Sequence, residues 1–288
     1  MQKTHVITGG TGGIGLYTAI GLARTGARVL VTGRNPERGL TAVERIRAVS
    51  GNDDVHLVTG DLATQAGVDA LADSLLDRVD RIHVLVNNAG MLSQSRQVTE
   101  DGVELNFAVN VVAPHRLTHR LKDALAAGTP SRVLVLTGGA PSGAFDASDL
   151  QSENGFVPLV NYTMTKRAEE AMALALATEL EPAGIYVTIV YPGRASTAMT
   201  QAMTPSSLPW FMRPAWPVFR FLIPKEDGGK SAELASRSSV FAATTPTLEG
   251  KAGTYVDMKQ KVAALHPTVH DPGNQERVLR AIQQGAGA

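Results

Sequence analysis

The feature that most restricts the fold is a glycine-rich stretch near the start of the chain, residues 8–15 (TGGTGGIG). A short β-branched segment at residues 5–7 precedes it, and apolar residues recur at helical spacing over residues 16–24. This pattern predicts a strand, a tight turn and a helix. A flexible surface turn is a poor explanation, because five glycines in seven positions lose much backbone entropy on folding. We predict instead that the turn lets a phosphate approach the helix N-terminus, where free N–H groups and the helix dipole favour negative charge.

Length and composition narrow the class of protein. The 288 residues show no break in composition, which predicts one domain spanning residues 1–288. Basic and acidic residues balance at 27 each without a basic block, so nucleic acid is not an expected partner. No apolar run is long enough for an integral membrane segment, and the first strand begins too early to leave room for a signal peptide. We therefore expect a cytoplasmic protein.

Strand-like and helix-like segments alternate along the chain. Strands are expected at residues 28–32, 55–58, 82–86, 132–136, 185–190 and 254–257. Helices are expected at residues 36–49, 68–79, 99–127 and 162–180, with another ending at 240–243 and a frayed tail from residue 283. This alternation predicts an α/β fold of the Rossmann type, with a doubly wound parallel sheet covered on both faces. Ligands of such sheets bind outside the carboxyl ends of the strands.

The ends of the expected strands carry candidate cofactor-binding residues. NAD sites place an acid about 20 residues after the glycines, whereas an arginine there accommodates the 2′-phosphate of NADP. This chain has Arg34, with Arg38 one helical turn later and no acid before Glu37, which favours NADP(H). Asp61 is placed to accept a hydrogen bond from an adenine amino group, although it also fits an ordinary N-cap. Small residues at 87–90 would let the backbone pass close beneath a cofactor.

A tyrosine and a lysine in the expected helix at 162–180 form a candidate acid–base pair. Tyr162 and Lys166 are four positions apart, so their side chains share one face. A free tyrosine has a pKa of about 10, and a neighbouring ammonium favours the phenolate and lowers that pKa. The pair therefore suits proton exchange with a carbonyl or an alcohol.

These motifs together resemble the short-chain dehydrogenase/reductase family along nearly the whole chain. The shared motifs are Thr8-Gly9-x-x-x-Gly13-Ile14-Gly15, Asn87-Asn88-Ala89-Gly90, Asn110, Tyr162-x-x-x-Lys166 and Pro192-Gly193. Residues 33–39 and the insert at 149–153 are similar to the retinol-dehydrogenase-like branch, whose members handle bulky apolar alcohols and carbonyls.

The resemblance implies hydride transfer at C4 of a nicotinamide, with Tyr162 transferring the proton. It implies that Lys166 binds the nicotinamide ribose and assists Tyr162, and that Asn110 supports a proton-relay water. The cofactor-binding positions it implies are Gly9, Thr11, Gly13, Ile14, Gly15, Arg34, Asp61, Leu62, Asn88, Ala89, Gly90, Lys166, Pro192, Gly193 and Thr197. Family members commonly pair through helices matching residues 99–127 and 162–180, which implies a homodimer or homotetramer.

One position departs from the family pattern. The family normally has a serine after the fifth strand, which hydrogen-bonds the substrate oxygen, whereas this chain has Gly138. Ser142 on the following loop or Thr137 next to the glycine could replace it, although successive strand residues point to opposite faces. The substrate could also supply its own hydroxyl, or the reaction could differ from ketone reduction.

The segment at residues 196–228 has an unusual composition and is expected to be the substrate lid. It contains Met199, Met203, Trp210, Phe211, Met212, Trp216, Phe219 and Phe221, and its five prolines preclude a long helix. An apolar, methionine-rich lining suits a bulky hydrophobic ligand. Two alternatives remain open: packing on the core or on a second subunit, and shallow membrane contact through the tryptophans with Arg213 and Arg220.

Histidine pairs do not indicate a metal site. His115 and His119 share a face of an expected helix, and His266 and His270 would do so if that region were helical. Neither pair comes with a third ligand at metal-binding spacing, so no metal is expected.

We therefore expect an NADP(H)-dependent oxidoreductase, a ketoreductase or dehydrogenase, acting on a small hydrophobic ketone or secondary alcohol. Two alternatives stay open. The glycine at position 138 is the reason for the first, an enzyme of this fold that catalyses a cyclisation, isomerisation or dehydration in a biosynthetic pathway. A catalytically silent NADP(H)-binding regulator is the other, although the intact Tyr162, Lys166 and Asn110 weigh against it.

Overall fold

The computed structural model describes residues 2–138, 145–223 and 225–285, which form one eight-stranded sheet in the order β3-β2-β1-β4-β5-β6-β7-β8. The strands are β1 (Thr4–Ile7), β2 (Arg28–Gly33), β3 (Val55–Thr59), β4 (Val84–Asn87), β5 (Ser131–Leu136), β6 (Ile185–Val190), β7 (Thr254–Val256) and β8 (Val262–Ala263). Neighbours from β3 to β7 pair in parallel, and only β8 pairs antiparallel among these strands. The predicted α/β Rossmann-type fold is confirmed.

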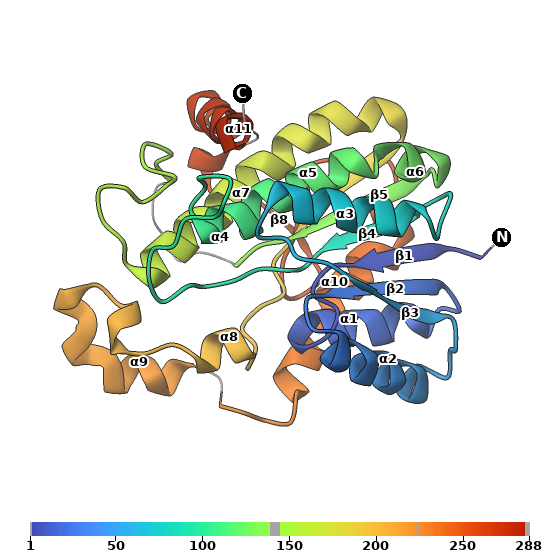
Figure 1. Ribbon diagram of the computed structural model, residues 1–288, viewed down its shortest axis with the longest axis horizontal. Coiled ribbons are helices and arrows are strands. Elements are labelled where there is room, and N and C mark those ends of the chain that lie inside the picture. The colour runs from blue at the N-terminus through green and yellow to red at the C-terminus, as the bar shows by residue number, and fades with distance from the viewer. Residues whose placement is uncertain (1, 139–144, 224, 286–288) are drawn as a thin grey trace.

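Helices cover both faces of the sheet (Figure 1). One layer contains α1 (Gly13–Ala23), α2 (Pro36–Ser50) and α10 (Lys230–Thr244), and the other contains α3 (Gln65–Leu76), α5 (Ala113–Arg120), α7 (Pro158–Leu180) and α11 (Pro272–Gly285). Successive strand residues enter opposite cores: Val6 packs in the cluster under α3, α5 and α7, whereas Ile7 packs in the cluster under α1 and α2. The strands are therefore apolar almost throughout.

The prediction of one long helix over residues 99–127 is wrong. The region contains the short helix α4 (Leu105–Phe107), a π-helical turn η1 (Ala108–Val112), α5, and α6 (Lys122–Ala127). Pro114, in the first turn of α5, has no N–H to donate to the carbonyl four residues earlier, which weakens a regular helix at this point. The wider π turn brings Asn110 inward, and such turns are frequent at functional sites.

Two elements at the C-terminal end were not expected. β8 extends the sheet, and α11 continues through residue 283, where the sequence predicted a frayed tail. Val278 and Ile282, one helical turn apart, are buried in the same core as α7, which holds α11 against the body of the molecule. Of the helices in the described residues, none combines the length and apolar character that crossing a membrane requires.

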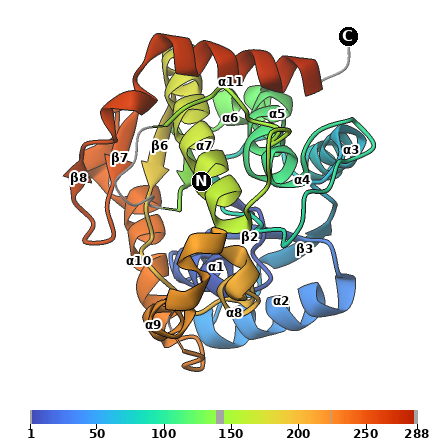
Figure 2. The ribbon, with the colours of Figure 1, turned by 90° about the vertical axis from the view of Figure 1, so that its left-hand side faces the viewer.

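The segment after β6 folds into short pieces that lie apart from the sheet. They are α8 (Ala198–Gln201), the 3₁₀ turns η3 (Pro205–Ser207) and η4 (Trp210–Ala215), and α9 (Trp216–Leu222). Figures 1 and 2 show α8 and α9 at the lower edge of the molecule, on the opposite side from α11. We refer to residues 196–228 as the lid.

Candidate active site

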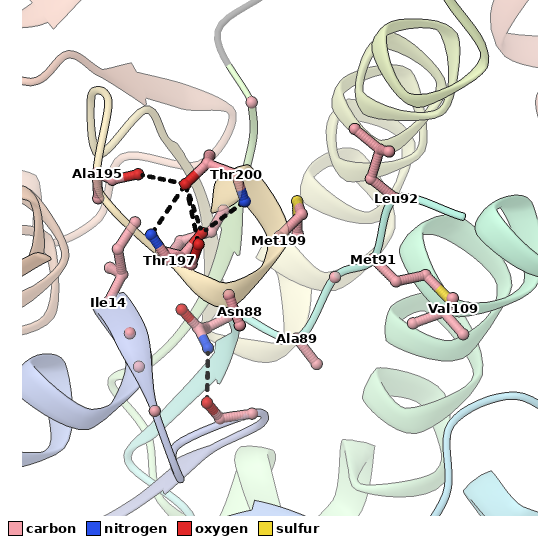
Figure 3. A pocket seen from close by; sticks show the side chains of 18 of the residues that line it. Ile14, Asn88, Ala89, Met91, Leu92, Val109, Ala195, Thr197, Met199 and Thr200 are labelled. Carbon is pink, nitrogen blue, oxygen red and sulfur yellow. Dashed lines mark hydrogen bonds between the residues drawn. The ribbon is translucent and has the colours of Figure 1, made fainter. Parts of the chain in front are cut away.

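A cavity of about 730 Å³ lies at the carboxyl ends of the central strands, under the lid. Sixteen of the eighteen candidate site residues line it: Gly9, Thr11, Gly13, Ile14, Gly15, Arg34, Asp61, Leu62, Asn88, Ala89, Gly90, Tyr162, Lys166, Pro192, Gly193 and Thr197. The remaining two are Asn110, which lies deeper, and Ser142, which falls outside the described residues. Figure 3 shows the lid residues Thr197 and Met199 facing Met91 and Val109 across this space.

The glycine turn is held against the end of β4 by Asn88. Its side-chain nitrogen Nδ2 donates to the carbonyl oxygens of Thr8 at 2.7 Å and Gly9 at 3.3 Å, and Figure 3 shows the amide pointing at the turn. A Cβ atom on Gly15 would lie 2.4 Å from that Nδ2 and 2.5 Å from the Gly9 oxygen. Gly9 also has a positive φ of 63°, which favours glycine. The turn therefore requires glycine for both space and backbone conformation.

The N-terminus of α1 is suited to a diphosphate. Its N-cap residue, Gly12, lines the cavity and offers no capping side chain, and the first turn has no acidic residue. The free N–H groups and the helix dipole therefore remain available to an anion. Thr197 from the lid closes this end, because a Cβ on Gly13 would lie 3.3 Å from its Cγ2.

Two arginines provide positive charge at the end of β2. Arg34 and Arg38 both line the cavity and are exposed, and Asn35 between them caps α2 by accepting from the Arg38 N–H at 2.9 Å. The cavity thus combines an uncapped helix N-terminus with two cations one turn apart, which fits a phosphorylated dinucleotide. Asp61 accepts from the Ala63 N–H at 3.0 Å, so its carboxylate has a local turn role there.

The side chain of Asn110, in η1, is fully buried and hydrogen-bonds the loop after β4 and helix α7. Its Oδ1 accepts from the Met91 N–H at 2.8 Å, and its Nδ2 donates to the Met91 carbonyl at 3.0 Å and to Thr165 Oγ1 at 2.9 Å. Its amide thereby links the loop after β4 to α7. A Cβ on Gly90 would lie 3.4 Å from Asn110 Oδ1 and 3.3 Å from Lys166 Nζ, so the glycine lets these groups approach.

Tyr162 and Lys166 project from one face of α7 into the cavity, as their spacing predicts. The Lys166 Nζ lies 5.9 Å from the centre of the Tyr162 ring and donates to the Leu136 carbonyl at 2.9 Å. The ammonium lowers the tyrosine pKa as expected, but a larger effect opposes it. Burial raises the pKa of Tyr162, and the opposing effect of the Lys166 ammonium is smaller.

Sequence reasoning missed two buried carboxylates on α7. Glu169 accepts from Lys166 Nζ at 2.7 Å, and Glu170 accepts from Arg167 Nη1 at 2.9 Å. Burial raises the pKa of Glu169 to about 7. A signal was present, because adjacent glutamates in an otherwise apolar stretch need partners if the helix is buried.

The hydroxyl of Thr137 does not replace the missing serine. It donates to Glu170 Oε1 on α7 at 2.6 Å, so its proton is already engaged. The space beside Gly138 is occupied instead, since a Cβ there would lie 3.1 Å from Tyr162 Oη and 3.0 Å from Lys166 Cγ. The tyrosine hydroxyl thus lies in tight contact with the position that a side chain at residue 138 would take.

Comparison with known proteins identifies the chain. The family model described as short chain dehydrogenase matches residues 3–207. The chain belongs to the short-chain dehydrogenase family. It lies in the retinol-dehydrogenase-like branch, being 31% identical to human retinol dehydrogenase 13 over 265 residues, with 91% of this chain and 78% of the relative covered. It is also 34% identical to mouse polyprenol dehydrogenase, covering 99% of this chain and 85% of the relative.

Solved structures agree with this assignment. An uncharacterized protein from Mycobacterium paratuberculosis superimposes with a TM-score of 0.76 at 22% identity, covering 99% of this dehydrogenase and 93% of that chain, which supports the fold. A structure described as an NAD(P)-dependent gluconate 5-dehydrogenase from Beutenbergia cavernae, with bound NADP, has a TM-score of 0.65 at 26% identity, with 89% and 94% covered. The dehydrogenase is therefore an oxidoreductase acting on CH–OH or C=O groups with a nicotinamide cofactor.

Part of the cavity lining is apolar. Its apolar side chains come from the lid and from the rest of the protein. The lid contributes Met199, Met203, Phe219 and Ile223, and the segments outside the lid contribute Met91, Leu92, Val109 and Leu159. The four lining residues outside the lid were not predicted from the sequence. Of the lid aromatics, Phe219 lines the cavity, whereas Trp210, Phe211 and Phe221 are exposed.

The histidine pairs are placed in different settings. His115 and His119 lie side by side on α5, with their rings tilted by 55° and their Nε2 atoms 3.2 Å apart, and His119 Nε2 lies 3.6 Å from Glu179 Oε2. His266 caps the 3₁₀ turn η6 (Pro267–Val269) and His270 follows it, so no α-helical face joins them. Across the described residues, no group of three potential ligands is arranged to hold a metal ion.

Proposed function

We propose that this protein is an NADP(H)-dependent dehydrogenase or reductase for a bulky hydrophobic ketone or secondary alcohol, with Tyr162 as general acid and base. One observation carries the proposal: Tyr162 lies in a single cavity between an arginine-flanked glycine turn and an apolar lid. Two relatives are named for retinol and polyprenol, alcohols with long apolar chains, which supports a lipophilic substrate.

The preference for NADP(H) is supported by charge. Arg34 and Arg38 line the cavity after β2, where an acid would be expected for NAD. Arginine binds phosphate oxygens through several N–H groups, whereas a neutral ribose hydroxyl gains less from it. The α1 N-terminus would hold the diphosphate, and Thr197, which lies at the glycine turn, would contact the remainder of the cofactor.

The chain's own residues then position and protonate the substrate. Bound cofactor supplies or accepts hydride at the nicotinamide C4. In reduction, the Tyr162 hydroxyl donates its proton to the carbonyl oxygen, and in oxidation its phenolate accepts the alcohol proton. Because burial keeps the pKa of Tyr162 high, the hydroxyl is protonated near neutral pH, which is the form that reduction needs. The Lys166 ammonium stabilises the phenolate left behind.

The test is the Tyr162→Phe variant, assayed with NADPH and a panel of apolar ketones and aldehydes. We expect turnover to fall by about 10² to 10⁴-fold, because general acid catalysis is lost, while NADPH affinity stays nearly unchanged. Tyr191→Phe is the matched control, since that tyrosine lines the same cavity and should keep activity. Unchanged turnover of Tyr162→Phe contradicts the assignment. Product formed without matching consumption of NADPH would point instead to isomerisation or dehydration.

A further inference from the structure

The lid has an apolar outer face that no other part of the described chain covers. We define this outer face as Trp210, Phe211, Met212, Val218 and Phe221. Trp210 is 78% exposed and Phe221 is 79% exposed, whereas large apolar side chains are normally buried. In both Figure 1 and Figure 2 α9 lies at the periphery of the molecule, away from the sheet. A concentration of this kind marks an interaction surface more often than chance exposure.

The same short helix has a second apolar side. Phe219 of α9 and Ile223 just beyond it line the cavity, while Val218 and Phe221 point outward. Trp216 stacks on Phe219, with ring centres 6.1 Å apart. The lid is therefore a thin apolar wall, with the candidate substrate cavity on one side and the outer face on the other.

The charged side chains within η4 and α9 are both cationic. Residues 210–222 contain Arg213 and Arg220, which are exposed, and no aspartate or glutamate. Lys225, Glu226 and Asp227 follow beyond α9. Arg213 donates to the Leu208 carbonyl and Arg220 to the Gln201 side chain, and neither takes part in an ion pair among the described residues. This local excess of positive charge occurs in a chain with no net charge.

We propose that the outer face of the lid docks on the surface of an anionic phospholipid bilayer. Tryptophan and phenylalanine beside arginine are the composition of an interfacial anchor, with rings at the headgroup level and cations near lipid phosphates. A symmetric dimer through this face is disfavoured by the same charges, because it would bring like arginines together and neither η4 nor α9 carries an acid to pair them. The docking concerns the lid alone and does not depend on the proposed redox reaction.

The test uses the purified full chain and vesicle flotation with phosphatidylcholine alone or mixed with phosphatidylserine. We expect the protein to bind the mixed vesicles and salt to weaken this binding. Relative to vesicles of phosphatidylcholine alone, the affinity should rise about fivefold for each cation that reaches the membrane surface. Intrinsic fluorescence gives a second readout, because the chain has two tryptophans, Trp210 and Trp216, and both are in the lid. Their emission should shift to the blue on binding.

Two variants separate the apolar and charged contributions. Trp210→Ser with Phe221→Ser should weaken binding at least tenfold, and Arg213→Glu with Arg220→Glu should abolish the preference for phosphatidylserine. The matched control is Leu40→Ser with Leu234→Ser, two exposed apolar side chains on α2 and α10, which should bind like the wild type. Circular dichroism and Tm check that each variant folds.

Three results would overturn the proposal. The first is no binding of the wild type to either vesicle. The second is equal loss of binding in the Leu40/Leu234 control. The third is a wild-type protein that does not bind vesicles and is a dimer in light scattering, while the Trp210→Ser with Phe221→Ser variant is a monomer. This result would assign the outer face to contact with a second copy of the chain.

Discussion

The ammonium of Lys166 donates to the carboxylate of Glu169 at 2.7 Å, one helical turn along α7, and both side chains are buried. Burial raises the pKa of Glu169 to about 7. The two charges act on Tyr162 in opposite directions, because the ammonium lowers the tyrosine pKa and the carboxylate raises it. Glu169 is thus a positioning residue that holds Lys166 and offsets its effect on the phenol.

Glu169→Gln should make Tyr162 easier to deprotonate. Removing the carboxylate leaves the Lys166 ammonium unopposed, so the pKa of Tyr162 should fall. We expect the alkaline rise of kcat for alcohol oxidation to move to lower pH, measured as a pH profile with saturating NADP. Glu170→Gln is the control, because that carboxylate binds Arg167 and Thr137 instead. A profile that does not move, or that moves equally in both variants, would contradict this role for Glu169.

Gly138→Ala should impair catalysis by displacing the tyrosine. The added Cβ would lie 3.1 Å from Tyr162 Oη and 3.0 Å from Lys166 Cγ, so both side chains must give way. Small displacements of reacting groups are costly, and we expect kcat to fall about tenfold. Gly138→Ser should be more active than Gly138→Ala, because its hydroxyl can donate to the substrate oxygen. Wild-type kcat in Gly138→Ala would show that the phenol does not need this space.

Arg34→Gln should weaken NADPH binding selectively. Losing a charged hydrogen bond to a phosphate removes about 1.5–3 kcal/mol, so the KM for NADPH should rise about tenfold or more. The KM for NADH, which has no 2′-phosphate, should change little. Arg45→Gln serves as the control, since Arg45 on α2 donates to Tyr17 Oη at 2.8 Å and does not line the cavity. Equal losses with both cofactors would argue against a role in choosing between them.

Buried His5 should make the protein acid-sensitive. Burial, followed by the charges of His83 and Lys3, lowers its pKa from 6.5 to about 4. The unfolded chain therefore takes up a proton between these values and the folded protein does not, so this stability is present above pH 6.5 and is lost as the pH falls towards 4. We expect the free energy of unfolding to be smaller by about 2–3 kcal/mol at pH 4.5 than at pH 7.5 through His5 alone.

Urea unfolding at the two pH values measures this loss. His5→Leu should reduce the pH dependence by about the same 2–3 kcal/mol, and the same change at exposed His270 should leave it intact. His115 contributes in the same direction, because burial lowers its pKa to about 4. A wild-type pH dependence in His5→Leu would show that His5 is not the group responsible.

Features that depend on neighbours along the chain could be predicted from the sequence. The glycine turn, the span Ile185–Val190 of β6 and the shared face of Tyr162 and Lys166 all follow from local spacing and backbone preference. The alternation of apolar strands and amphipathic helices likewise determined the parallel sheet, and with it the edge where Arg34 lies.

Other features depend on segments far apart in the chain. Glu169 becomes a buried partner of Lys166 only because α7 packs against the sheet, and Thr137 turns to Glu170 only because β5 lies beside that helix. Pro114 and the contacts of Asn110 with Met91 and Thr165 accompany a π turn where periodicity predicted a regular helix.

The lid shows the same division most clearly. Its sequence determined that the segment is rich in apolar residues and unable to form a long helix. Only the tertiary structure decided that Phe219 faces the cavity while Phe221 faces outward, because hydrophobicity favours burial without specifying which surface provides it.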